Sequence, residues 1–156
     1  MEAIERTRQE LVGSEFDWLV ADANGCLALC LTAGCGEVPD SLLRHGGPQL
    51  ERYSAAVASI LDRVPENGSC RQEGRGVGAD LESLGYATRG LYLFDWKHWS
   101  GPYQRIVVPE LPVQGATLAD VLGDFAALVP TLPMSFAGTR RFQLYELLAC
   151  SRLHGD

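Results

Sequence analysis

Five cysteines and three histidines are the side chains of this chain that most readily bind a metal or act as nucleophiles. Cys26, Cys30 and Cys35 follow one another closely, and His45 comes ten residues later. Structural zinc sites usually place roughly two to four residues between paired ligands within a turn. Cys26 and Cys30, however, lie along a predicted strand, where residues four apart are separated by about 13 Å. We therefore expect core thiols, with no metal and no cofactor.

Cys35 differs from the other cysteines because it lies in a glycine-flanked loop, in the segment AGCGE. A nucleophilic cysteine needs an electropositive setting and a nearby base, and His45 could supply that base. The spacing does not link the two residues. A small cysteine-dependent enzyme or ligand-binding domain that uses Cys35 and His45 is therefore the alternative to a non-catalytic protein.

The other catalytic patterns fail on spacing. The glycines of GRGVGAD, residues 74–80, do not follow the order of a dinucleotide-binding loop, and no apolar strand leads into them. Carboxylates such as Asp17, Asp22 and Glu110 stand at predicted strand positions, whereas catalysis by a carboxylate pair requires a defined separation. The histidines suggest no Ser/His/Asp set. We expect no catalytic residues and a binding function.

The segment DWKHWSGPY, residues 95–103, is the strongest candidate for a binding surface. Tryptophan and tyrosine dominate binding hot spots because they offer a large rigid area with a polar handle. Trp99 follows the predicted strand end in a polar loop, although folding back over the sheet edge is an alternative for this side chain. The residues that we expect to bind a partner are Asp95, Trp96, His98, Trp99, Tyr103 and Glu110.

Two β-hairpins are predicted to position these residues. In the first, FDWLVADANGCLALCLT, the dipeptide Asn24-Gly25 suits a two-residue type I′ turn, which places Val20 opposite Leu29. In the second, GLYLFDW pairs with YQRIVVP. Pairing Trp96 with Tyr103 sets Leu93 opposite Ile106, and this register matches aliphatic residues across the strands.

Helical patterns surround the hairpins. Helices are expected in the first dozen residues, from Pro48 to Val64, in a short stretch from Asp80 to Gly85, and from Thr117 to Leu128. Residues 140–149 fit either a strand or a helix, and we favour a strand. The result is an α+β fold, whose mostly antiparallel sheet of two hairpins plus that C-terminal strand is packed by helices.

Composition limits the class of protein. A chain of 156 residues, 46% hydrophobic and 21% charged, predicts one globular domain over residues 1–156. The N-terminal segment lacks the apolar core of a signal peptide, and the cysteine number is odd, so we expect a cytoplasmic protein with free thiols. A net charge of −7 disfavours nucleic acids and acidic membranes as partners, and suits a basic protein.

Three segments resemble small cytoplasmic immunity proteins, which are encoded beside bacterial polymorphic or contact-delivered toxins. They are the FDWLVADANG hairpin, the LTAGCGEVPDSL segment that follows it, and the later GLYLFDW and RIVVPELPV strands. The resemblance covers residues 16–39 and 90–129. It implies a protein that binds one cognate toxin domain with a basic surface and neutralises it. The resemblance assigns no individual binding residue, because such interfaces differ between pairs.

Overall fold

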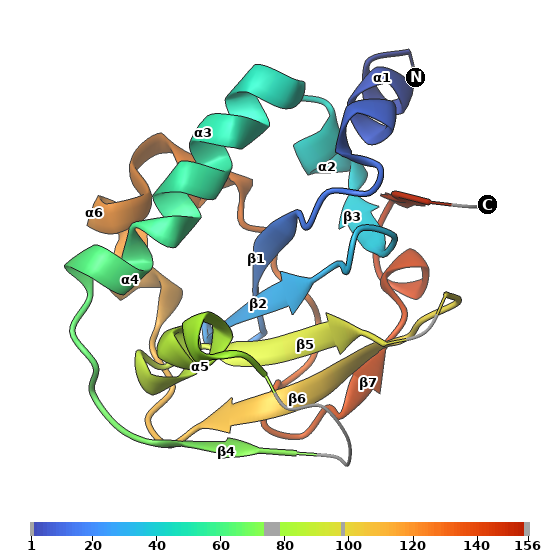
Figure 1. The fold of residues 1–156 in the computed structure, drawn as a ribbon. Coiled ribbons are helices and arrows are strands. Elements are labelled where there is room, and N and C mark those ends of the chain that lie inside the picture. The colour runs from blue at the N-terminus through green and yellow to red at the C-terminus, as the bar shows by residue number, and fades with distance from the viewer. Residues whose placement is uncertain (1, 74–78, 98, 155–156) are drawn as a thin grey trace.

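A six-stranded mixed sheet forms the centre of the computed structural model, which describes residues 2–73, 79–97 and 99–154 (Figure 1). The strands are β1 (Asp17–Ala21), β2 (Leu27–Leu31), β4 (Cys70–Gln72), β5 (Tyr92–Trp96), β6 (Tyr103–Pro109) and β7 (Arg141–Phe142). Their order is β1-β2-β5-β6-β4, and β7 also pairs with β6. Only the pairing of β2 with β5 is parallel among these strands. The predicted α+β fold is confirmed, with a sheet that is mixed.

Helices and a smaller sheet surround this centre. The helices are α1 (Glu2–Leu11), α2 (Asp40–Leu43), α3 (Gly47–Ala58), α4 (Ile60–Arg63), α5 (Leu81–Thr88) and α6 (Ala119–Leu122), with 3-10 turns η1 (Gly115–Leu118), η2 (Gly123–Leu128) and η3 (Leu144–Glu146). Strands β3 (Glu37–Pro39) and β8 (Cys150–Arg152) form an antiparallel pair. None of the helices described is long and apolar enough to cross a membrane.

The register of the first hairpin differs from the prediction by one residue. Leu19, and not Val20, lies opposite Leu29. The turn is longer than a type I′ turn because Asp22 and Cys26 close it, and the Asp22 carboxylate accepts hydrogen bonds from the amides of Asn24 and Cys26, each at 2.9 Å. Gly25 alone within the loop has a positive φ, +82°. The Asp22 side chain therefore stabilises a longer turn than the expected two-residue type I′ turn. The longer turn shifts the strand register by one residue, and such a shift exchanges the side chains that share a face of the sheet.

The second hairpin follows the predicted register near its tip. Trp96 pairs with Tyr103, as expected. The register then shifts between Leu93 and Phe94, so that Leu93 lies opposite Val107. The predicted pairing of Leu93 with Ile106 is therefore wrong. A β-bulge inserts one unpaired residue into a strand. Its position could not be predicted by matching aliphatic residues across the two strands.

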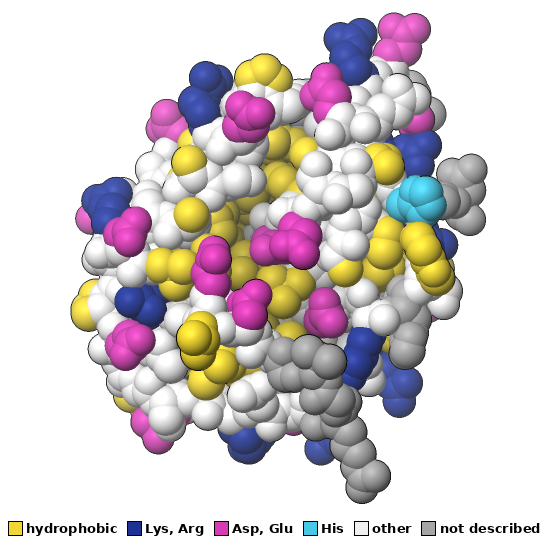
Figure 2. Space-filling model, in the orientation of Figure 1, with side chains coloured by type: hydrophobic (Ala, Val, Ile, Leu, Met, Phe, Trp, Pro, Cys, Tyr) yellow, Lys and Arg dark blue, Asp and Glu magenta, His cyan; other side chains and the backbone are white. Residues whose placement is uncertain are grey.

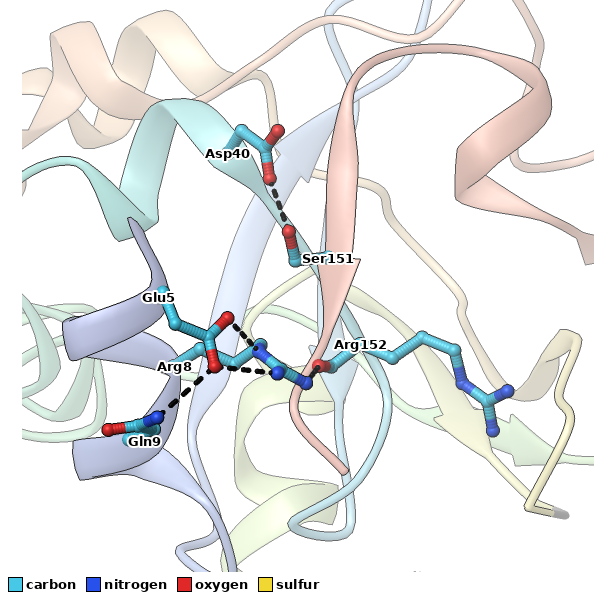
Figure 3. A network of polar contacts seen from close by, with 6 residues as sticks. All are labelled: Glu5, Arg8, Gln9, Asp40, Ser151 and Arg152. Carbon is cyan, nitrogen blue, oxygen red and sulfur yellow. Dashed lines mark hydrogen bonds and ion pairs between the residues drawn. The ribbon is translucent and has the colours of Figure 1, made fainter. Parts of the chain in front are cut away.

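Hydrogen bonds connect α1, near the N-terminus, and α2 with strand β8, near the C-terminus. Arg8 of α1 donates a hydrogen bond to the carbonyl oxygen of Arg152 at 3.2 Å, and the Ser151 hydroxyl donates to Asp40 at 2.8 Å (Figure 3). The segment 140–149 that precedes β8 combines the two-residue strand β7 with the turn η3. The preference for a strand there was therefore only partly right, because the segment changes conformation after Phe142.

Two other elements differ from the prediction. The helix from Thr117 is a short α6 between two 3-10 turns, and α5 continues beyond Gly85 to Thr88. Asp80 caps α5 as predicted, since its carboxylate accepts a hydrogen bond from the Ser83 amide at 2.8 Å. Helix α5 packs against β5 and β6 of the sheet.

Candidate functional site

Three residues on the neighbouring strands β1, β2 and β5 form a row across the sheet. Asp17 of β1 pairs with Leu31 of β2, and Leu31 pairs in turn with Asp95 of β5. Residues paired across neighbouring strands project from the same face of a sheet. Two carboxylates therefore flank one leucine on a single face.

Helix α5 closes this row into a cleft. Asp80, Glu82, Ser83 and Tyr86 belong to α5 or its cap, and they line a hollow of about 190 Å³ together with the row. Glu15, from the segment before β1, forms another part of its wall. Helix α5 lies across β5 in Figure 1. The cleft thus brings together five carboxylates from separate parts of the chain.

The electrostatics of the cleft oppose the ionisation of Asp17. Burial raises the pKa of its carboxyl from 3.8 to about 7, and the charges of Glu15, Glu82 and Asp80 raise it further, while a hydrogen bond from the Thr32 backbone offsets part of this effect. Burial also raises the pKa of Asp95, despite the nearby Lys97. A cation that enters the cleft would stabilise these carboxyl groups in their ionised form and lower their pKa, because opposite charges attract.

A larger groove adjoins the cleft, and Glu15 lines both. This groove, of about 590 Å³, runs between the end of α1 and the first turns of α3. Its apolar part comprises Leu11, Phe16, Pro48 and Leu50. Figure 2 shows acidic side chains gathered around hollows with an apolar floor on this face. We call the cleft and the groove together the acidic face.

Charge on the acidic face is of one sign. Its carboxylates are Glu10, Glu15, Asp17, Glu51, Asp80, Glu82 and Asp95. Among the described residues that line the two hollows, none is a lysine, arginine or histidine. The described part of the chain also holds no cluster of three or more side chains that could ligate one metal ion. The carboxylates are therefore arranged around a space and do not converge on a point.

The residues predicted to bind a partner do not form one surface. Trp96 and Tyr103 are buried, with 2% and 0% of their surface exposed, so they are core residues and cannot supply contact area. The Tyr103 hydroxyl donates to the Glu37 carbonyl oxygen at 2.5 Å. Tyrosine and tryptophan bury well when their polar atoms find partners, and this is why composition alone misplaced them.

The other predicted residues are dispersed. Trp99 is 67% exposed and its ring lies 5.1 Å from that of His154. Glu110 is exposed just beyond the opposite end of β6 from the hairpin tip, so the seven-residue strand separates it from Trp99 by roughly 23 Å. Asp95 is half-buried in the cleft, and His98 lies outside the described residues. The expected combined patch is therefore not formed, and the binding role of Asp95 and Trp99 stays a prediction.

The cysteine alternative gains no support from the geometry. Burial raises the pKa of Cys35, and the nearby Arg152 only partly opposes this change. A catalytic thiol needs the opposite shift. Within the described residues, no hydrogen bond links Cys35 with His45, which is exposed. Cys30 is fully buried in the core.

Comparisons of the chain with models of protein families, with curated proteins and with solved structures found no match. The acidic face was not predicted from the sequence, although Asp17 was noted there as a strand carboxylate and Asp95 as a residue expected to bind a partner. The parallel pairing of β2 with β5 brings them to one row, and that long-range pairing leaves no local sequence signal.

Proposed function

We propose that this protein is a non-catalytic binding protein whose acidic face binds a basic region of another protein. The observation that carries the proposal is the set of seven carboxylates around two adjoining hollows, with no cationic side chain among their described lining residues. Following the resemblance noted above, the partner is a cognate bacterial toxin domain, and binding neutralises it.

The shape of the acidic face supports a protein partner. Protein interfaces combine an apolar centre with a polar rim. The groove offers the accessible side chains of Leu11 and Pro48 within a rim that includes Glu10, Glu15 and Glu51. Leu81, at the start of α5 beside the cleft, is 88% exposed and adds a further apolar contact.

Electrostatic complementarity would act mainly on the rate of association. Clefts lined by one sign of charge attract an oppositely charged partner and can raise association rates by roughly 10- to 1,000-fold. Such an interface suits an inhibitor that must capture its target before the target acts. It also predicts that association slows as salt concentration rises.

A co-expression assay tests the proposed function. The product of the reading frame beside this gene is expressed from an inducible promoter in bacteria, alone or with this protein, and growth is measured. The proposal predicts growth arrest that the wild-type protein relieves and that the double variant Glu15→Gln/Glu82→Gln relieves less well. Asp120→Asn/Asp124→Asn removes the same charge from exposed positions outside both hollows, and it should protect fully. Absence of arrest, or no protection by the wild-type protein, would refute the proposal.

A further inference from the structure

We propose that the cleft binds a single guanidinium group, so that one arginine side chain of the partner inserts over Leu31 between Asp17 and Asp95. The proposal rests on the proposed function for the identity of the partner. The cleft itself can be tested without that partner.

Geometry favours a bridging group over a point charge. Asp17 and Asp95 stand on strands two positions apart in the sheet, and strand spacings of about 4.8 Å place their backbones about 10 Å apart. A ligand that contacts both carboxylates must donate hydrogen bonds in two directions. The guanidinium group carries five N–H donors in a flat fork, whereas the lysine ammonium is a compact charge. The apolar side chain of Leu31 between the carboxylates also suits a flat, weakly hydrated group.

A second feature of the cleft, independent of its acidic residues, indicates a ligand. Tyr86 lines the cleft with only 6% of its surface exposed. In the described part of the chain, none of the side-chain hydrogen bonds engages its hydroxyl group. Among the described residues, the buried side-chain polar atoms without a partner are Gln143 Oε1 and Arg152 Nε, so the Tyr86 hydroxyl oxygen is open to the cleft, where a ligand can reach it. A bound guanidinium can donate to this oxygen as well as to the carboxylates.

Other cations fit the cleft less well. No described group of three or more carboxylate, histidine or cysteine side chains can hold a metal ion, which argues against Ca²⁺ or Mg²⁺, since these ions need several oxygen ligands around one point. The volume of about 190 Å³ admits the end of one long side chain. The adjoining groove can then receive apolar residues that neighbour the arginine in the partner.

The test is an NMR titration of the ¹⁵N-labelled protein with three blocked peptides, acetyl-Leu-Arg-Leu-amide and its citrulline and lysine counterparts. Citrulline has the shape of arginine without its charge. We expect the arginine peptide to shift the amide signals of Leu31, Ser83 and Asp95, the citrulline peptide to bind at least tenfold more weakly, and the lysine peptide several-fold more weakly. Equal binding of the citrulline or lysine peptide, or shifts confined to other surfaces, would overturn the proposal.

Substitutions in the cleft test whether the arginine peptide binds there. Asp95→Asn should weaken binding of the arginine peptide about tenfold, and Glu82→Gln, at an exposed position in the first turn of α5, should weaken it several-fold. Asp120→Asn/Asp124→Asn should leave it unchanged. If the cleft variants bind the peptide as the wild type does, the site is wrong even where the co-expression assay shows protection. If the peptide binds the cleft but no toxin is neutralised, the site stands and the proposed function fails.

Discussion

The substitution Asp17→Asn offers a direct test of the electrostatics of the cleft. Asparagine keeps the size of the side chain and a carbonyl oxygen that can accept the hydrogen bond from Thr32, but it carries no charge. The pKa of Asp17 is raised from 3.8 to about 7 in the folded protein, first by burial and then by Glu15, Glu82 and Asp80. Tyr86 and the half-buried Asp95 also line this cleft.

The sign of the effect follows from proton binding. Between pH 4 and pH 7 the folded protein keeps a proton on Asp17 that the unfolded chain has already lost, so the free energy of unfolding falls as the pH rises through this range. Each pH unit is worth about 1.36 kcal/mol, which gives at most about 4 kcal/mol. We expect about 2 to 4 kcal/mol, because Glu15 and Glu82 are exposed and salt screens their charges.

Urea denaturation of the wild type and of Asp17→Asn, followed by circular dichroism at pH 4.5 and pH 8, measures this contribution. The two proteins should have similar stability at pH 4.5, and the variant should be more stable at pH 8 by the amount given above. Asp120→Asn serves as the control, since it should show no such pH-dependent gain. A variant that is equally or less stable than the wild type at pH 8 would refute the account of the cleft.

Three further predictions concern the core and the thiols. Asp22→Ala should lower the free energy of unfolding by about 3 to 5 kcal/mol, because the carboxylate accepts hydrogen bonds from three backbone amides, one of them that of Phe136; urea denaturation measures this loss, and a change below about 1 kcal/mol would contradict it. Arg105→Met should cost a similar amount, since its guanidinium binds both oxygens of Glu73 and two backbone carbonyls; thermal unfolding with Arg63→Met, at an exposed position, as the control tests this. Cys35 should react with iodoacetamide at pH 7 no faster than a simple thiol, because its pKa is raised; mass spectrometry of the alkylated peptide would show a fast reaction if the reasoning is wrong.

Local chemistry in the sequence predicted local structure well. Asp80 caps α5 through the Ser83 amide as expected, and Pro48 lies in the first turn of α3. Both features depend on residues a few positions apart. The tip of the second hairpin, with Trp96 opposite Tyr103, was also predicted correctly, because matched side chains and a short loop determine that register.

Features that depend on distant residues were not predicted. The parallel pairing of β2 with β5 joins segments about sixty residues apart, and together with the pairing of β1 with β2 it brings Asp17 and Asp95 into one row. The Asp22 carboxylate holds the turn of the first hairpin and also binds the amide of Phe136, so the register of that hairpin depends on a contact far along the chain. The dipeptide Asn24-Gly25, on which the predicted turn was based, gives no information about this contact.

The proposal that the acidic face binds a toxin domain is the central claim, and isothermal titration calorimetry tests it most directly. The domain encoded by the neighbouring reading frame, inactivated if necessary, is titrated into the wild-type protein, into Glu15→Gln/Glu82→Gln and into Asp120→Asn/Asp124→Asn at low and high salt. We predict that the first variant binds at least tenfold more weakly, that the second binds as the wild type does, and that salt weakens binding of the wild type most. Equal affinity of all three proteins would contradict the claim.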